Sequence, residues 1–460
     1  MRNFQKLLLG LALAGLGSSA VYASAYRVDI EDEAVAEASV PEVVDPNLVV
    51  DKMITEYLNK GKGKEIRKQM KESNGWIGYA TAEVSVSPEN PDWAKFRRNA
   101  YDKAVADIEA QYIKMQYQSI KAENVKELFA NAAGEVPDFS YEDAGDPSKF
   151  GQILDKLLAV TEGKLDKELD ELGVDKEQFA RAPESQRHVM LSESLVKSTM
   201  VESMGSISGL IPVQTFEGFN EQKEHVIGVV CVVSPKLKQF AYDVLHRRGQ
   251  IAPTDRAGED LYELFSADDA LLIDQFGVRK MIDEDGYPVL ISFGQWSNSS
   301  RSENQTLVRK YRMAAKKQAE AQALNQLAMF LNGKTMVQSQ SDMGELFEEA
   351  YKVHPDNYKE QDMVNSIIDT FHEKSRDVSK VNVSGLVPLY SWTVKHPDYG
   401  HEIVGVIMMW SPKTEKAARE SREWKPGRTP SSSGSVPAQE EQNGRNGSKT
   451  GEDYMDLDDF

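Results

Sequence analysis

Cysteine is almost missing from this sequence of 460 residues, which contains Cys231 alone. No disulfide can therefore form within the chain, and a metal site built from several thiolates is excluded. Cys231 lies in the apolar run of residues 229–233, where we expect a small buried side chain, with a reactive thiol as the alternative. A secreted protein of this size without disulfides depends on its core for stability, which favours a bacterial periplasm over a eukaryotic exterior.

Positive charge is also scarce. The chain has 54 Lys and Arg residues against 73 Asp and Glu residues, which gives a formal net charge of -19. Neutralising nucleic-acid phosphates or an anionic membrane surface requires clustered Lys and Arg side chains. The composition therefore argues against a general nucleic-acid binder and against a protein of anionic membrane surfaces.

Long apolar runs are missing except at the N-terminus. Residues 7–16 form the apolar run there, and it is too short to span a bilayer. Arg2 and Lys6 precede it, and Ala23-Ser24-Ala25 supplies the small residues of a cleavage site. We predict that residues 1–25 are a cleaved secretory signal, with a retained anchor as the alternative. The mature chain is then periplasmic or secreted and has no membrane span.

Catalytic motifs are missing too. The sequence has no Gly-x-Ser-x-Gly elbow, phosphate-binding glycine loop or dinucleotide fingerprint in a suitable context. The seven histidines are scattered, but His396 and His401 flank a turn, where a weak metal or anion contact is the alternative to a solvated loop. Asp283-Glu284-Asp285-Gly286 lacks the alternating ligands of a calcium loop and indicates a tight acidic turn. We therefore expect no catalytic residue, no metal and no cofactor.

One stretch of the sequence occurs twice. Ser208-Gly209-Leu210-Ile211-Pro212-Val213 returns 176 residues later as Ser384-Gly385-Leu386-Val387-Pro388-Leu389. Two shorter matches follow each copy, namely Gly228-Val229-Val230 with Gly405-Val406-Ile407, and Ser234-Pro235-Lys236 with Ser411-Pro412-Lys413. The spacing shifts by one residue between the copies, which indicates a duplicated unit.

The segments before each copy also correspond. In the first unit, residues 76–87 alternate as in a strand, and a long helix starts at Trp93, with apolar residues three and four positions apart. In the second unit, residues 288–296 form the expected strand and residues 304–331 the helix, so that Arg97 corresponds to Arg312. A second helix, at 184–204 or 358–378, leads into each copy of the motif. An apolar strand returns after the motif in both units.

This order resembles the small α/β domain of flagellar-assembly T-ring proteins and related bacterial surface lipoproteins. The resemblance covers roughly residues 75–235, without an insertion, and 286–412, and it carries no catalytic motif. Leu16 stands where the lipoproteins have their lipid-attached cysteine, so no lipid anchor is expected. The resemblance implies a non-enzymatic envelope domain used in assembly or binding. We predict an α+β fold of two tandem repeats, each a small antiparallel sheet packed against two helices on one face.

These patterns divide the chain into consecutive segments. A flexible acidic lead-in (26–47) follows the signal. The remaining parts are a first repeat (48–235) with a helical insertion at about 134–185, a helical connector (236–287), a second repeat (288–425) and a disordered acidic tail (426–460).

Two places suit binding. Trp296 and Trp392, with Trp410 nearby, either pack in the core or line a groove for an apolar ligand or peptide. In the tail, Tyr454, Leu457 and the terminal Phe460 suit capture by a partner's groove, with an inert solubilising tail as the alternative. The leading hypothesis is a non-enzymatic periplasmic interaction or scaffold protein with an envelope protein partner. The alternatives are a binding protein for a peptide or small apolar ligand between the repeats and, third, a hydrolase.

Overall fold

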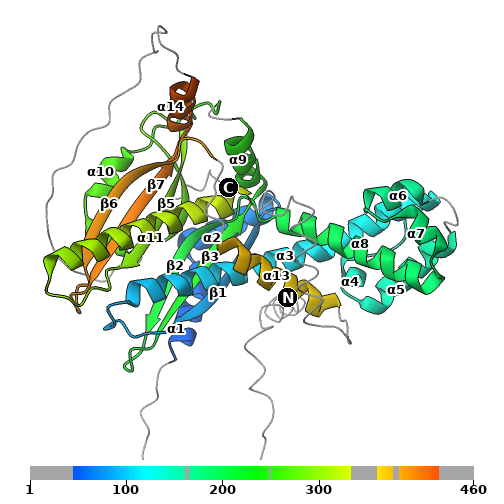
Figure 1. Ribbon diagram of the computed structural model, residues 1–460, viewed down its shortest axis with the longest axis horizontal. Coiled ribbons are helices and arrows are strands. Elements are labelled where there is room, and N and C mark those ends of the chain that lie inside the picture. Colours follow the sequence, from blue (N-terminus) through cyan, green and yellow to red (C-terminus); the bar gives the residue numbers. More distant parts are fainter. Residues whose placement is uncertain (1–44, 161–164, 248–249, 333–359, 377–382, 424–460) are drawn as a thin grey trace, which may run out of the picture. The chain divides into compact units, whose positions relative to one another are not determined.

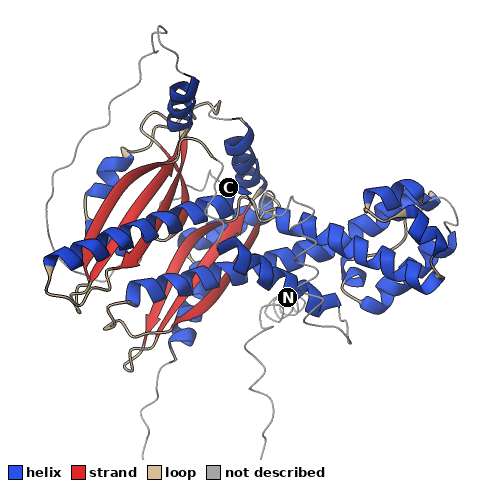
Figure 2. Ribbon diagram, in the orientation of Figure 1, coloured by secondary structure: helices blue, strands red, loops and turns tan. Residues whose placement is uncertain are grey.

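The computed structural model describes residues 45–160, 165–247, 250–332, 360–376 and 383–423. The chain has an α+β fold with two antiparallel sheets (Figures 1 and 2). Within those residues, no helix is both long and apolar enough to cross a membrane. The expected signal peptide, nearly all of the lead-in and the whole tail lie outside the described residues.

The first sheet has the strand order β1-β3-β2 and is covered on both faces. Apolar residues of helix α3, such as Ile108, pack against alternate residues of β3, such as Val229 and Cys231. Helices α1 and α2 pack on the opposite face through Val50, Ile54 and other apolar side chains. The sequence predicts helices on one face only, and the segment from residue 46 to 72 supplies the other layer. These elements are β1 (Trp76–Val84), β2 (Ile211–Phe219), β3 (His225–Val233), α1 (Pro46–Asn59), α2 (Gly61–Glu72) and α3 (Trp93–Ala133).

The second sheet has the strand order β4-β5-β7-β6. Figure 1 shows α11 crossing it, and Ala319 and Ala323 of this helix pack in the same core as Leu290 and Val406 of the sheet. On the other face, Phe265 of α10 packs edge-on against Phe293. These elements are β4 (Gly277–Ile282), β5 (Pro288–Ser297), β6 (Val387–Lys395), β7 (Glu402–Trp410), α10 (Leu261–Ser266) and α11 (Gln305–Asn332).

Strand β4 lies in the connector, for which the sequence predicts helices. Helix α9 (Pro235–His246), α10 and the 3-10 helix η1 (Asp269–Asp274) do occupy parts of it. Arg279 and Lys280 interrupt the apolar pattern of β4, which hides the strand in the sequence. The Arg279 side chain is buried and donates to the carbonyl oxygen of Pro212 in β2 at 3.0 Å. This bond ties the edge of the second sheet to the edge of the first.

The second helices of the two units both pack on α3. Helix α8 (Glu184–Gly205) does so within its own unit, through Met200 and Met204. Helix α13 (Glu360–Arg376) belongs to the second unit, yet Ile367 and Phe371 share the core of α3. Tyr117 and Lys121 of α3 both donate to Oε1 of Glu360 in α13, the tyrosine hydroxyl at 2.8 Å. The two halves are therefore interlocked.

Four short helices fall within the predicted insertion. They form a separate apolar core with the end of α3 and the start of α8, which includes Leu128, Phe150, Leu154 and Leu191. The helices are α4 (Tyr141–Ala144), α5 (Pro147–Val160), α6 (Asp166–Glu171) and α7 (Lys176–Arg181).

The repeated motif has the same backbone geometry in both halves. Gly209 and Gly385 have φ of +84° and +85°, and a Cβ at either would lie within 3.0 Å of the backbone of the helix that follows the hairpin. These helices are α9 and α14 (Pro412–Glu423). Ser234 and Ser411 cap them by accepting bonds from the backbone N–H groups of Leu237 and Thr414. The shared motif therefore positions a hairpin against a helix, while duplication as its origin stays a prediction.

Candidate functional site

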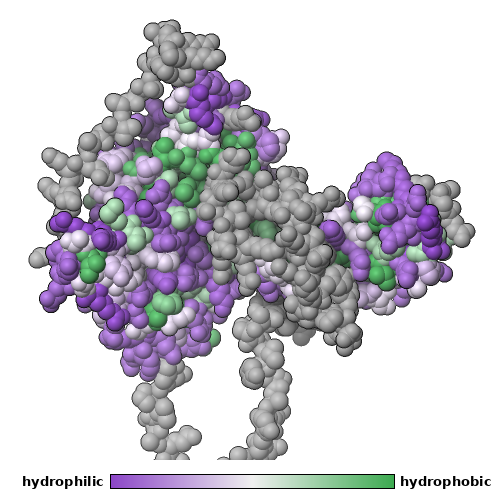
Figure 3. Space-filling view, viewed as in Figure 1, coloured by the Kyte–Doolittle hydropathy of each residue, from purple (hydrophilic) through white to green (hydrophobic). Residues whose placement is uncertain are grey.

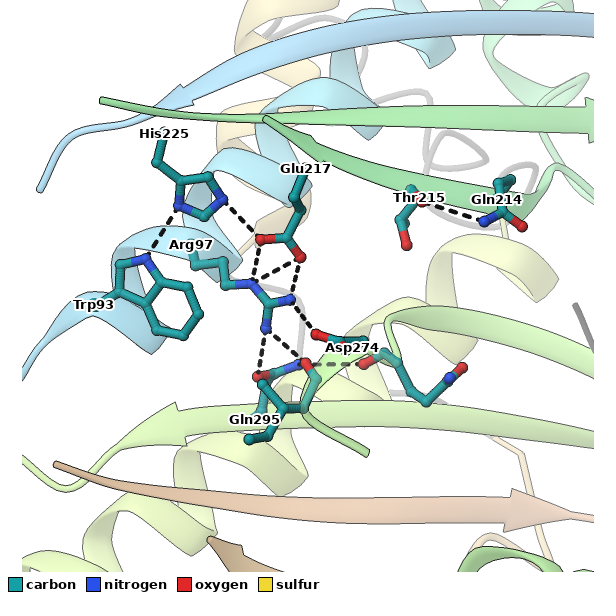
Figure 4. Close-up of polar contacts among 10 residues, drawn as sticks. Trp93, Arg97, Gln214, Thr215, Glu217, His225, Asp274 and Gln295 are labelled. Atoms are coloured by element: carbon teal, nitrogen blue, oxygen red, sulfur yellow. Dashed lines mark hydrogen bonds and ion pairs between the residues drawn. The ribbon is translucent and has the colours of Figure 1, made fainter. Parts of the chain in front are cut away.

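The most polar buried place in the described chain surrounds Arg97, on the inner face of α3. Its guanidinium is 1% exposed. Nε donates to both carboxylate oxygens of Glu217, at 3.1 and 2.9 Å, and Nη2 donates to Glu217 and to Asp274, the latter at 3.0 Å. Nη1 donates to the carbonyl oxygen of Ile273 at 2.6 Å and lies 3.5 Å from Oε1 of Gln295 (Figure 4). We call Trp93, Arg97, Glu217, His225, Asp274 and Gln295 the junction cluster, because they come from both halves.

The charges of the cluster determine its protonation. Burial disfavours the charged forms, but the two carboxylates raise the pKa of Arg97, so it remains a cation. Burial likewise opposes ionisation of Glu217, but Arg97 and His225 hold its pKa well below the usual range. At Asp274 the effect of burial is larger than the attraction of Arg97, and repulsion from Glu217 adds to it. The pKa of Asp274 therefore rises to about 6. One guanidinium thus faces two carboxylates, and it stabilises the negative charge of Glu217 more than that of Asp274.

His225 links Trp93 to this ion pair. The indole N–H of Trp93 donates to Nδ1 of His225 at 3.1 Å, and Nε2 lies 2.7 Å from Oε2 of Glu217. Because an indole can only donate, Nδ1 must accept and Nε2 must carry the proton; this assigns the tautomer. Both ring nitrogens are therefore engaged, and no lone pair is left to take a proton from a substrate. The His225–Glu217 pair is a structural contact.

His396 and His401 meet near the start of α3, as the turn between them allows. Their ring centroids are 4.8 Å apart, and both rings pack edge-on against Trp93, at 5.0 and 6.2 Å. Burial lowers the pKa of His396 to about 4, and burial also lowers the pKa of His401. Among the described residues, no group of three His, Cys, Asp or Glu side chains is arranged to hold a metal ion.

A separate pocket of about 270 Å³ lies where α2 ends and α9 begins. Trp76, Tyr112, Met115 and Val233 contribute to its wall, together with Lys238. The rings of Trp76 and Tyr112 are 5.0 Å apart, and Nζ of Lys238 lies 5.4 Å from the Tyr112 centroid. Burial lowers the pKa of Lys238. We call this cavity the Lys238 pocket.

The two tryptophans expected to line a groove lie on opposite faces of the second sheet. Trp296 pairs with Val404 and Trp392 with Gly405, and neighbouring residues of one strand face opposite ways. Trp392 is buried over Gly405, while Trp296 is partly buried beneath Lys95. They therefore do not share a groove. The tail residues Tyr454, Leu457 and Phe460 lie outside the described residues, and Cys231 is fully buried.

Sequence reasoning missed the junction cluster and the Lys238 pocket. Arg97 lies one turn after Trp93, one turn before Ala100 and two turns before Ala104, on the face predicted to be buried. A charged residue at a core position was the available signal. Its partners are at least 120 residues away in sequence, and nothing in their local pattern marks them.

Comparison with known proteins adds a partial family match. Residues 150–246 match the model of a domain of unknown function, DUF6844. A hypothetical protein of Francisella tularensis, solved by crystallography, is similar in structure at 20% identity and a TM-score of 0.48, over 82% of this chain and 93% of that one. Among curated proteins, none matches the sequence.

Proposed function

We propose that this chain is a non-enzymatic interaction or scaffold protein of the bacterial cell envelope, exported by the signal of residues 1–25. The junction cluster and the α3–α13 contacts join its two halves through buried charges, which supports a scaffold role. A scaffold acts through the surfaces it presents. The junction cluster places buried, hydrogen-bonded charges between the two halves, which supports this proposal over a ligand groove there.

The observation that carries this proposal is the exposed start of α11. Leu307, Tyr311 and Met313 are all exposed on this segment, at 41%, 50% and 66%. Leu307 and Tyr311 are four positions apart and share one side of the helix, whereas Met313 lies on another side. Large exposed apolar side chains that gather on one surface are typical of interaction sites. Figure 3 shows a hydrophobic patch within a hydrophilic surface over the left end of this helix.

The same segment is basic in an acidic protein. Arg309, Lys310, Lys316 and Lys317 are exposed, and no carboxylate of the described chain forms an ion pair with any of them. Cations that have no ion-pair partner within the described residues, beside apolar side chains, favour an acidic protein surface as the partner. We call residues 305–317 the α11 docking face, and an acidic envelope protein is the partner it suits.

The test is photo-crosslinking in cells with a crosslinking residue at position 314, which is exposed on the side of α11 that carries Leu307, followed by mass spectrometry. A specific acidic envelope protein is expected, and its yield should fall strongly in a Leu307→Asp, Lys310→Glu variant. Tyr242→Ser is the matched control, because Tyr242 is also exposed, at 54%, but lies on α9. Equal crosslinking in all three proteins, or no reproducible partner, would overturn the proposal.

A further inference from the structure

The Lys238 pocket has the chemistry of a peptide site. Its volume of about 270 Å³ is smaller than the roughly 300–1,000 Å³ of typical small-molecule sites, and it suits one large side chain. Trp76 and Tyr112 supply flat apolar walls. The half-buried side chain of Lys238 forms no ion pair with a carboxylate of the described chain, and its ammonium group lies over the Tyr112 ring. An apolar side chain flanked by carboxylates would match these groups.

The rim of the pocket is basic. Lys71, Lys114 and Lys236 are exposed and lie within three residues of lining positions in sequence. None of the three forms an ion pair within the described part of the chain. In a protein of formal charge -19, this grouping of cations attracts acidic segments.

The sequence contains a segment with the complementary chemistry. Residues 452–460 carry five carboxylate side chains and the large apolar residues Tyr454, Leu457 and Phe460, with no Lys or Arg. About 30 residues separate them from the end of α14 at Glu423, and such a linker extends to about 100 Å and has a root-mean-square span of about 30 Å. A globular protein of about 400 residues has a radius of gyration of only about 22 Å. The segment can therefore reach the pocket.

We propose that residues 452–460 bind the Lys238 pocket of the same chain, with one apolar side chain against the wall that Trp76 and Tyr112 form together and carboxylates against Lys238 and the rim. This contact is independent of the α11 docking face. It makes the tail a ligand of its own body, which an acidic segment of another protein could displace.

The full-length protein allows a direct test. A photo-crosslinking residue at position 116 in the pocket wall is expected to react with residues 452–460. Reactivity of Lys238 toward an amine-labelling reagent should rise severalfold in a Tyr454→Ala, Leu457→Ala, Phe460→Ala variant, while Lys310 on α11 serves as the internal control. High salt should raise the wild-type rate in the same direction, because screening weakens the charge contacts.

Three outcomes would overturn the proposal. Crosslinks from position 116 to other segments only would show a different occupant. Unchanged Lys238 labelling in the triple variant would show that the tail does not cover the pocket. Crosslinks between isotopically labelled and unlabelled chains in a mixture would place the tail in a second copy instead of the same chain.

Discussion

Trp93 donates its indole N–H to Nδ1 of His225, and its ring lies 4.8 Å from the guanidinium carbon of Arg97. The tryptophan therefore fixes the histidine tautomer that donates to Glu217 and also covers the cation that pairs with it. A single residue at the start of α3 thus orients both partners of a buried carboxylate. The cluster therefore links the two halves through buried hydrogen bonds and ion pairs.

Substitution of Arg97 by methionine should be strongly destabilising. It leaves Glu217 buried without its cation, a type of loss that costs about 3–5 kcal/mol. Arg312→Met is the matched control, because Arg312 bonds Glu402 but is 43% exposed, and we expect a loss of only about 0–1 kcal/mol. Urea unfolding of both variants measures the difference. Similar losses would show that the buried contacts of Arg97 stabilise the fold no more than the partly exposed pair of Arg312 does.

A second substitution sharpens that test. Glu217→Gln in the Arg97→Met background removes the orphaned charge, so part of the lost stability should return. If the double variant is no more stable than Arg97→Met alone, the uncompensated carboxylate is not the cause of the loss.

The glycines of the repeated motif should not tolerate alanine. Gly209→Ala and Gly385→Ala combine a left-handed backbone with a collision against the backbone of α9 or α14, and we expect losses of about 2–5 kcal/mol. Gly400→Ala separates the two effects, since Gly400 has φ of +70° but open space around it, and should lose about 1–2 kcal/mol. Thermal and urea unfolding report the ranking. Equal effects at all three positions would exclude the close approach as a cause.

Glu109 predicts a pH dependence of stability. Burial raises the pKa of this carboxyl in α3 to about 8 from its ordinary value of 4.5, with a further contribution from Asp102. Nδ1 of His372 lies 3.3 Å from Oε2, a distance that permits an ion pair, but the loss of hydration outweighs this one contact. The folded chain therefore binds the proton more tightly than the unfolded chain does. The stabilisation is fully present below about pH 4.5 and is lost as the pH rises toward 8, at up to about 1.4 kcal/mol per pH unit.

Urea unfolding between pH 5 and 9 checks this sign. Glu109→Gln should flatten the profile and be more stable than the wild type at the alkaline end. Glu83→Gln, at an exposed position of β1, is the control and should leave the profile unchanged. Parallel profiles for Glu109→Gln and the wild type would contradict the assignment.

The sequence predicts most helices and strands of this fold because its apolar spacing is regular. The spacing from Trp93 to Ile108 places a buried helix face, and the apolar run around Cys231 places a strand. The prediction of helices on one face only missed the layer that α1 and α2 form on the other. The apolar pattern does not reveal strand β4, because a charged residue, Arg279, occupies one of its buried positions. Arg279 is accommodated there by its hydrogen bond to the carbonyl oxygen of Pro212 in β2. Periodicity does not reveal such long-range partners.

The candidate sites were harder to anticipate for the same reason. Arg97 and Glu217 meet through tertiary packing across 120 residues, and Trp76 and Lys238 meet at the ends of separate elements. The pairing of α13 with α3 was equally hidden, since an amphipathic pattern shows that a helix has an apolar face but not which element covers it.

The contact between Lys121 and Glu360 also has a consequence for biosynthesis. The two residues are 239 positions apart. At about 5–20 residues per second, roughly 12–48 s pass on the ribosome between their appearances. Through that interval α13 cannot cover the apolar side of α3, so the first half completes its core only after most of the chain has been made. The interface between α3 and α13 therefore forms late, after residue 360 has been added to the chain.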